Sequence, residues 1–227
     1  MQAAARLGVG VHAGTAVTGI RVAGGRVAGV ETTAGPIATR LVVDAAGGRA
    51  REVAALAGVA IPSSTQRLEA LVTESVRPFL RPGVALLDLL GYCHQTTRGE
   101  FVGGTELRGV TPPDSMRTTL AGLRDAAVKF TTAFPLLHAV RVIRQWAGIV
   151  DVTPDFAPVL GPVADVEGLW LDCGWTYGFM GAPGAAVLLA EAMTSGRLPP
   201  ALAPFDLGRF ASGRLIAEGS LVVEAAG

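Results

Sequence analysis

The sequence predicts an α/β (α+β) fold with one buried parallel sheet and one antiparallel sheet. The run Leu41–Ala45 is apolar almost throughout and leads into glycines, which is typical of a parallel strand covered on both faces. The stretch Gly168–Gly196 has the pattern of a short strand, a glycine-rich turn and a helix. Short alternating runs between Ile61 and Val150 predict a second sheet. We therefore expect domains over residues 1–60, 61–148 and 149–227, the last returning to the first domain.

The N-terminal part contains a predicted hairpin. Residues Met1–Leu7 have the pattern of the last turns of a helix, and Val9–His12 that of a short strand. Two alternating segments, Ala16–Val22 and Arg26–Thr32, flank the pair Gly24-Gly25. A glycine pair between two alternating runs is typical of a two-residue hairpin turn.

The next segment leads into the buried parallel strand. Residues Ile37–Arg40 alternate, and after Leu41–Ala45 the residues Arg49–Ala57 predict a helix closed by a glycine. The predicted strand needs parallel neighbours, and Leu169–Asp172 is the obvious candidate. Since a two-stranded parallel sheet is not expected to stand alone, the remaining strands are expected from sequence before Met1.

The middle of the chain predicts a separate sheet with one helix. The helix is expected over Asp114–Thr132, with Leu120, Leu123, Ala127 and Val128 on one face. The strands are expected at Arg67–Thr73, Val84–Leu90, Gly91–Gln95, Glu100–Gly104 and Val140–Val150.

Two further segments carry candidate chemistry. Pro154 disfavours helix at Thr153, and Asp155 could cap a turn or belong to a loop at the rim of a pocket. Pro183 is suited to a first helical turn, and the helix would end at Gly196. Its positive end would favour negative charge near the preceding glycine-rich turn, although an apolar helix packed in a core has the same pattern.

Composition excludes several classes of protein. Half of the 227 residues are hydrophobic, 17% are charged, and the formal net charge is zero, which argues against disorder and against a nucleic-acid surface. No run approaches about 18 apolar residues and no signal-peptide pattern is seen, so we expect no membrane span and a cytoplasmic location. The two cysteines are expected to be reduced. Neither they nor the three histidines have the spacing of metal ligands, which predicts no metal site.

Taken together, these segments resemble the FAD-dependent amine oxidoreductases of the D-amino-acid-oxidase superfamily, and within it the sarcosine oxidase β-subunit group. The likeness covers nearly the whole chain in order. It is carried by Ala16–Ile20, Val43–Gly47, Gln95, Gly99-Glu100, Gly103-Gly104, Trp146–Gly148, Thr153–Asp155, Gly174-Trp175, Gly178-Phe179, Pro204-Phe205 and Arg209-Phe210.

The resemblance implies an incomplete FAD-binding Rossmann-like domain with an inserted antiparallel-sheet substrate domain. It also implies hydride transfer to FAD from the C–N bond of an amine or amino acid, a sarcosine-like secondary amine first of all. A general base is not required by it, because hydride transfer from a neutral amine depends mainly on positioning. The cofactor-binding residues implied by position are Val17, Ala46, Gly47, Gly174, Thr176, Gly178 and Met180.

The sequence departs from the family pattern. The Gly-x-Gly-x-x-Gly phosphate loop and the histidine that attaches FMN would both lie upstream, so FMN is expected only with other segments or subunits. The glycine-rich turn is slightly shorter than usual. Met180 stands where the family commonly has a lysine that pairs with the substrate carboxylate. Three alternatives stay open: Arg98 or Arg144 takes that anion, the substrate is not an ordinary amino acid, or this copy of the family pattern is degenerate.

Three functional hypotheses stay open from the sequence. The chain belongs to a catalytic FAD-dependent oxidoreductase, alone or in a hetero-oligomer with other oxidase subunits. Alternatively, it is a truncated or partner-dependent non-catalytic subunit of such an enzyme. The third hypothesis is a binding module that holds a nucleotide without redox chemistry.

Overall fold

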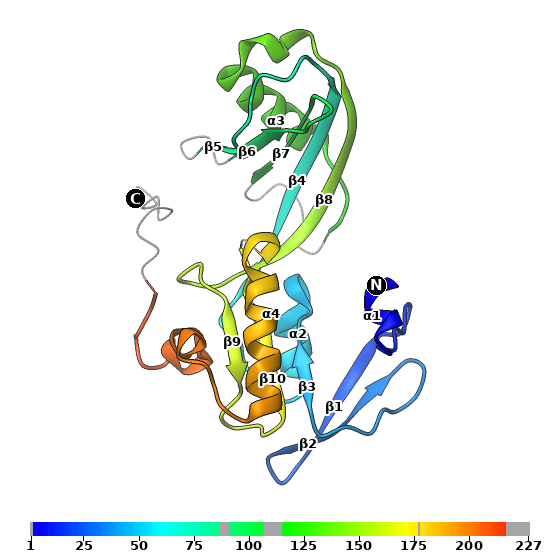
Figure 1. The fold of residues 1–227 in the computed structure, drawn as a ribbon, viewed down its shortest axis with the longest axis vertical. Coiled ribbons are helices and arrows are strands. Elements are labelled where there is room, and N and C mark those ends of the chain that lie inside the picture. Colours follow the sequence, from blue (N-terminus) through cyan, green and yellow to red (C-terminus); the bar gives the residue numbers. More distant parts are fainter. Residues whose placement is uncertain (1, 87–90, 107–114, 177, 217–227) are drawn as a thin grey trace. The chain divides into compact units, whose positions relative to one another are not determined.

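The chain forms two compact units in the computed structural model (Figure 1). The structure describes residues 2–86, 91–106, 115–176 and 178–216. The first unit comprises Met1–Pro62, Pro158–Cys173 and Tyr177–Arg214. The second unit comprises Ser63–Ala157, Gly174–Thr176 and Leu215–Gly227. The assignment of residues 1–60, 61–148 and 149–227 to FAD-binding and substrate domains stays a prediction.

The first unit contains the predicted hairpin. β1 (Val17–Ala23) pairs antiparallel with β2 (Arg26–Thr32). Gly24 and Gly25 between them have φ of 57° and 77°, the left-handed values that a two-residue hairpin turn requires. The hairpin prediction is therefore confirmed.

Two predicted strands near the hairpin are corrected by the structure. Residues 9–12 form no strand, and no described strand pairs with them, so this short segment lacks the hydrogen bonds that a strand needs. The predicted strand Ile37–Arg40 is reduced to a single antiparallel bridge between Ile37 and Val30. Alternation alone does not make a strand unless another strand supplies the hydrogen bonds.

A three-stranded sheet forms the centre of the first unit, in the order β3-β10-β9. β3 (Val42–Asp44) pairs parallel with β10 (Leu169–Cys173), which confirms the predicted parallel neighbour. β9 (Val159–Pro162) pairs antiparallel with β10 on its other side. Gly168 precedes β10 with φ of 88°, and a Cβ there would stand 2.1 Å from the carbonyl oxygen of Arg40. Only glycine allows the backbone at residue 168 to approach the backbone at Arg40 so closely.

Helices and short 3₁₀ turns complete the first unit. The α-helices are α1 (Gln2–Arg6), α2 (Ala50–Ala55) and α4 (Gly178–Ser195). The 3₁₀ turns are Gly47–Arg49, Pro200–Phe205 and Leu207–Arg209.

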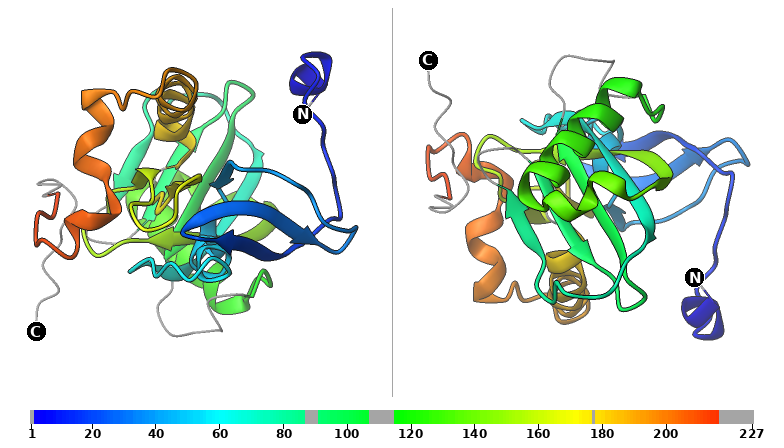
Figure 2. Two further views of the ribbon diagram at one scale, coloured as in Figure 1. Left: turned by 90° about the horizontal axis from the view of Figure 1, so that it is seen from below. Right: turned by 90° about the horizontal axis from the view of Figure 1, so that it is seen from above.

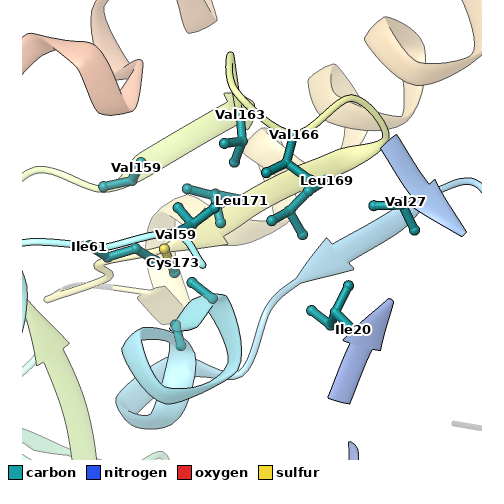
Figure 3. Close-up of a cluster of buried hydrophobic side chains, with 12 residues drawn as sticks. Ile20, Val27, Val59, Ile61, Val159, Val163, Val166, Leu169, Leu171 and Cys173 are labelled. Carbon is teal, nitrogen blue, oxygen red and sulfur yellow. The ribbon is translucent and has the colours of Figure 1, made fainter. Parts of the chain in front are cut away.

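The hydrophobic core of the first unit joins the hairpin to the three-stranded sheet, as Figure 3 shows. Ile20 and Val27 come from the hairpin, and Leu169 and Leu171 come from β10. The other buried members are Ala50, Ala54, Val59, Ile61, Val159, Val163, Val166 and Cys173. Burial of these side chains stabilises the hairpin on the sheet, together with backbone hydrogen bonds that join Gly25 and Val27 to Glu167.

The second unit is built on a five-stranded antiparallel sheet in the order β5-β6-β7-β4-β8. Its longest pairing joins β4 to β8, from Ser64 opposite Val152 to Thr73 opposite Val142. The strands are β4 (Ser64–Ser75), β5 (Val84–Leu86), β6 (Gly91–Gln95), β7 (Glu100–Glu106) and β8 (Val142–Val152). The predicted strands are confirmed, except that residues 87–90 of Val84–Leu90 lie outside the described residues.

One helix, α3 (Leu120–Ala133), lies across one face of this sheet (Figure 2). A 3₁₀ turn, Pro135–Ala139, follows it. The core between helix and sheet contains buried Leu71, Cys93, Phe101, Ala126, Phe130 and Leu137. α3 therefore closes this face of the sheet to solvent.

The start and the buried face of α3 both differ from the prediction. Thr119 is the N-cap, because its hydroxyl accepts a hydrogen bond from the N–H of Gly122, so the helix begins at Leu120. The predicted start, Asp114, lies outside the described residues, and residues 115–119 are not helical. The predicted apolar face is only partly confirmed: Leu123 packs against the core, whereas Ala127 is exposed and Leu120 and Val128 are 63% and 64% exposed. The buried residues are Gly122, Ala126, Lys129 and Phe130.

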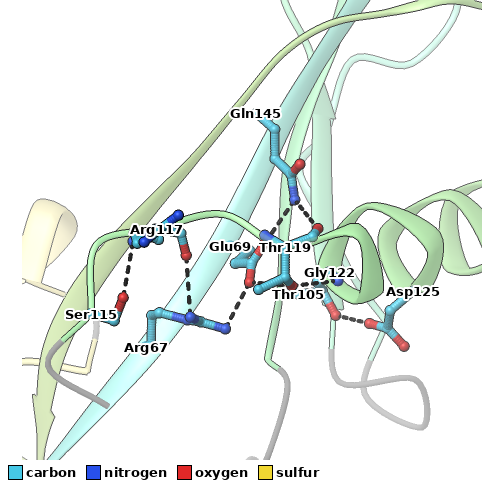
Figure 4. A network of polar contacts seen from close by, with 9 residues as sticks. All are labelled: Arg67, Glu69, Thr105, Ser115, Arg117, Thr119, Gly122, Asp125 and Gln145. Carbon is cyan, nitrogen blue, oxygen red and sulfur yellow. Dashed lines mark hydrogen bonds and ion pairs between the residues drawn. The ribbon is translucent and has the colours of Figure 1, made fainter. Parts of the chain in front are cut away.

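A buried polar network explains why a glycine and a lysine face the sheet (Figure 4 shows its Glu69 and Asp125 parts). Glu69 of β4, 2% exposed, accepts hydrogen bonds from Arg67 Nη2 (2.7 Å), Gln145 Nε2 (2.7 Å) and the backbone N–H of Thr119 (2.9 Å). A Cβ on Gly122 would stand 2.2 Å from Glu69 Oε2, so only glycine leaves room for this carboxylate. The Lys129 ammonium binds the Asp125 carboxylate and donates to the Thr105 hydroxyl.

Candidate functional site

The first unit presents two strand ends at one edge of its sheet. β3 and β10 are parallel, and Asp44, the last residue of β3, stands opposite Leu171 of β10. The backbone N–H of Ala46 donates to Asp44 Oδ1 at 3.1 Å, which turns the chain sharply after β3. Gly47 follows with φ of 57°, and no atom lies within 4 Å of where its Cβ would be. A ligand can therefore approach the backbone at the carboxyl edge, the usual binding edge of parallel sheets.

α4 begins earlier than predicted. Pro183 was expected in the first turn, but the helix starts at Gly178 and Pro183 lies inside it. The proline removes only the hydrogen bond that residue 183 would give to the carbonyl of Phe179, and the rest of the helix tolerates this loss. Gly196, with φ of 69°, ends the helix as predicted.

The first turn of α4 is exposed. Phe179 is 99% exposed and Met180 is 77% exposed, and the first-turn N–H groups have no acceptors within the helix. The positive end of the helix dipole lies here and favours negative charge. Met180, predicted as a cofactor-binding residue, brings a thioether and no charge to this end.

In the second unit, a buried carboxylate holds the turn that precedes α4. Asp151 of β8 is 2% exposed and accepts a hydrogen bond from the backbone N–H of Gly174. Gly174 has φ of 73° and is the first residue of the turn Gly174–Thr176. Asp151 was not among the predicted site residues, and its only signal in the sequence is its place just before Thr153-Pro154-Asp155.

Thr176, another predicted site residue, carries an unsatisfied group. Its hydroxyl oxygen is buried and has no hydrogen-bond partner among the described residues. A buried hydroxyl without a partner costs about 1–3 kcal/mol, so such groups in native proteins usually mark a ligand, a water or a functional role. Thr176 Oγ1 is therefore the group in this turn that a ligand would satisfy.

The Asp155 turn is confirmed as a structural element. Asp155 Oδ1 accepts from the Thr153 hydroxyl at 3.1 Å and from the Ala157 N–H at 3.3 Å. Its Oδ2 accepts from the N–H of Ile216 at 3.1 Å. These bonds hold the end of the β8 segment together, as the sequence predicted for a capping aspartate.

The two arginines predicted to bind the substrate anion lie toward the other end of the second sheet. Arg144 stands opposite Val72, seven residues before Asp151 on β8, which corresponds to about 23 Å of strand. Arg98 lies in the turn between β6 and β7, and its Nε is 3.3 Å from Glu100 Oε1. The Thr96 hydroxyl, with help from Arg98, holds the pKa of the Glu100 carboxyl below its usual range. Neither arginine is brought to the Gly174 end, and their role stays a prediction.

Val17, a predicted cofactor-binding residue, begins β1, stands opposite Thr32 and is partly exposed.

Cys93 and Cys173 are free and buried, and burial raises the pKa of the Cys93 thiol. In the described ranges, no His, Cys, Asp and Glu side chains group in a way that could hold a metal ion. No described helix has the length and apolar character needed to cross a bilayer.

A separate open pocket of about 520 Å³ lies on the second unit beside β8. None of the predicted site residues lines it. Its walls are Met116, Arg117, Thr118, Gln145, Trp146 and Ala147.

Comparison with known proteins now decides the family. The family model described as FAD dependent oxidoreductase (DAO) matches residues 1–192. The chain belongs to this FAD-dependent oxidoreductase family. The predicted resemblance and fold class are therefore confirmed, and members of the family are FAD-binding flavoproteins.

Curated relatives of the DAO family match almost all of the chain. Sarcosine oxidase subunit beta of Rhodobacter capsulatus is 34% identical over 218 residues, which cover 96% of this chain and 52% of that protein. Hydrogen cyanide synthase subunit HcnC of Pseudomonas aeruginosa is also 34% identical, covering 92% of this chain and 50% of that protein. The chain thus spans about half the length of the curated relatives it matches.

Solved structures of the family share the fold. L-Proline dehydrogenase from P. horikoshii superimposes with a TM-score of 0.79 and 28% identity, covering 89% of this chain and 55% of that one. Glycine oxidase from Geobacillus kaustophilus gives a TM-score of 0.81 at 23% identity, covering 91% and 55%. The second likeness concerns the fold alone.

The residues present fit the flavin that the DAO family implies. The turn Gly174–Thr176 offers a buried hydroxyl that lacks a partner, and Gly47 leaves open space beside the backbone. The first turn of α4 presents N–H groups that have no acceptor within the helix, together with the positive end of a dipole. Within each unit taken by itself, these groups are of the kind that suits the polar, electron-rich edge of a flavin ring.

Proposed function

We propose that this chain serves in an FAD-dependent oxidoreductase that oxidises the C–N bond of an amine or amino acid. The observation that carries the proposal is the family match over residues 1–192. The unpartnered hydroxyl of Thr176, at a position predicted to contact the cofactor, supports it independently.

The chain's own residues would bind and polarise the cofactor. When bound, FAD supplies the acceptor for the hydride equivalent that leaves the substrate carbon. The Thr176 hydroxyl would hydrogen-bond to the flavin, and Gly47 would allow it to lie close to the backbone. The N-terminus of α4 would stabilise negative charge that develops on the flavin, which is electrostatic preorganisation. The proposed contacts are Val17, Ala46, Gly47, Gly174, Thr176, Gly178 and Met180.

For the substrate we propose a sarcosine-like secondary amine. Relatives from Rhodobacter capsulatus, Rhizobium meliloti and Arthrobacter named sarcosine oxidase subunit beta, at 33–34% identity, support this choice. Met180 cannot pair with a carboxylate, so any substrate carboxylate needs another cation, for which Arg98 and Arg144 remain the proposed candidates.

We also propose that the chain works in a hetero-oligomer with other oxidase subunits. Two groups of relatives, the sarcosine oxidase and hydrogen cyanide synthase proteins, bear names that call them subunits. A partner-dependent, non-catalytic subunit is the second candidate, and Met180 favours it because the thioether lacks the charge of a lysine. FMN is proposed only with other segments or subunits, and a cytoplasmic location is proposed for test by cell fractionation.

The test is flavin content and reduction in the protein as its own host makes it. A tag within the coding sequence at the native locus lets the protein be purified with every segment and subunit that accompanies it. We expect bound FAD and anaerobic bleaching of the flavin band by a secondary amine. A folded protein without flavin would contradict the proposal, whereas bound FAD that no amine bleaches would favour the non-catalytic candidate.

A further inference from the structure

Asp151 joins two segments of the second unit that are distant in sequence. It is the penultimate residue of β8, and its backbone stands opposite Thr65 of β4, so the strand fixes its position. Its carboxylate accepts a hydrogen bond from the N–H of Gly174. The first residue of the turn Gly174–Thr176 is therefore attached to the sheet.

The hydrogen bond is of a strong kind. A carboxylate that accepts from a backbone N–H makes a charge-assisted bond, roughly twice as strong as a neutral one. At 2% exposure, Asp151 is shielded from the water that would compete for it. The left-handed φ of Gly174, 73°, lets the chain turn directly at the point of attachment.

Two residues after the attachment point stands Thr176 with its buried, unpartnered hydroxyl. A hydroxyl can select one ligand atom only if the backbone that carries it is held in place. We propose that Asp151 is a positioning residue, which holds the turn Gly174–Thr176 so that the Thr176 hydroxyl meets the cofactor. This inference rests on the proposed function for the identity of the ligand, FAD, but not for the attachment itself.

Asp155 provides the matched control. It is also a buried carboxylate at the end of the β8 segment, 6% exposed. Its carboxylate accepts hydrogen bonds from Thr153, Ala157 and Ile216, whereas the N–H of Gly174 donates to Asp151. A change at Asp155 should disturb its own turn without releasing Gly174.

The first experiment measures amide hydrogen exchange at Gly174 in the natively purified protein after removal of flavin. Asp151→Asn replaces the charge-assisted bond by a neutral one, and we expect exchange about tenfold faster. Asp155→Asn should leave Gly174 unchanged. If Asp151→Asn does not fold, Asp151→Glu is the second variant, because it keeps the charge but moves the carboxylate away from the N–H of Gly174. Unchanged exchange in the Asp151 variants would overturn the attachment, whether or not the protein binds FAD.

The second experiment is a double-mutant cycle on FAD affinity with Asp151→Asn and Thr176→Val. If Asp151 acts through Thr176, Asp151→Asn weakens binding about tenfold when Thr176 is present and less than about twofold when it is Val. Equal losses in both backgrounds would show a general structural role and overturn the positioning. A wild-type protein that binds no FAD would defeat the proposed function, and the exchange result would then stand alone.

Discussion

Glu69, at the centre of β4, accepts hydrogen bonds from both the backbone N–H and the hydroxyl of Thr119, the residue that caps α3. The same hydroxyl accepts from Gly122 in the first turn of the helix. The start of α3 is therefore fixed by a carboxylate fifty residues away in the sequence. These bonds help to hold a helix on the sheet although most of its predicted apolar face, Leu123 excepted, is exposed.

Removing the charge of Glu69 should destabilise the second unit. In Glu69→Gln the buried guanidinium of Arg67 loses its carboxylate partner, and an uncompensated buried charge costs about 3 kcal/mol. Urea unfolding followed by circular dichroism measures the loss. Glu31→Gln, in the exposed pair with Arg21, should change stability by less than about 0.5 kcal/mol. Equal effects of the two variants would refute the role given to the buried pair.

Local patterns were enough to predict much of the fold. The pair Gly24-Gly25 located the hairpin, and the apolar run at Leu41–Ala45 predicted a parallel partner that proved to be β10. In these segments the conformation depends on nearby residues and on which faces are buried. The family resemblance added the expectation of an FAD-binding domain with an inserted antiparallel-sheet domain.

What the sequence could not predict depends on contacts between distant residues. The buried face of α3 follows from where Glu69 and Thr105 lie on the sheet, which helical periodicity does not contain. The attachment of Gly174 to Asp151 likewise needs β8 and the turn to meet in space. The unpartnered hydroxyl of Thr176 could be recognised only once its surroundings were known.

Two glycines should respond to alanine in opposite ways. In Gly168→Ala, the left-handed backbone and the 2.1 Å approach to the Arg40 carbonyl should together cost more than about 2 kcal/mol. Gly184→Ala lies inside α4 with no atom within 4 Å of the new Cβ, and should stabilise by up to about 1 kcal/mol. The Tm of both variants measures these effects. A Gly168→Ala protein as stable as the wild type would show that β10 does not require the close contact between residue 168 and the Arg40 carbonyl.

A cation at position 180 should change substrate preference. Met180→Lys places an ammonium group in the exposed first turn of α4, where a substrate carboxylate could pair with it. We expect the KM of a carboxylate-bearing amine to fall about tenfold relative to that of an amine without a carboxylate. Val187→Lys, further along the same helix, is the control for added charge. If both variants shift the KM ratio alike, the effect comes from the overall field and not from this position.

The pair of Glu74 and Arg141 should make a small acid-sensitive contribution to stability. Hydrogen bonds from the Arg141 side chain and backbone hold the pKa of the Glu74 carboxyl below its ordinary value of 4.5. Because the folded pKa is the lower one, the contribution is complete above 4.5 and is lost as the pH falls through the lowered value. Tm measured across this acid range should fall less in Glu74→Gln than in the wild type. If Tm falls equally with pH in Glu74→Gln and in the wild type, this pair does not contribute to the acid sensitivity of the protein.

The most direct test of a flavin-dependent function is the absorption spectrum of the natively purified protein before and after anaerobic addition of a secondary amine. We predict a bound flavin, released on denaturation as FAD, whose visible band bleaches when sarcosine or a similar amine is added. A well-folded preparation that contains this chain, carries no flavin and shows no amine-dependent change would contradict the proposed function.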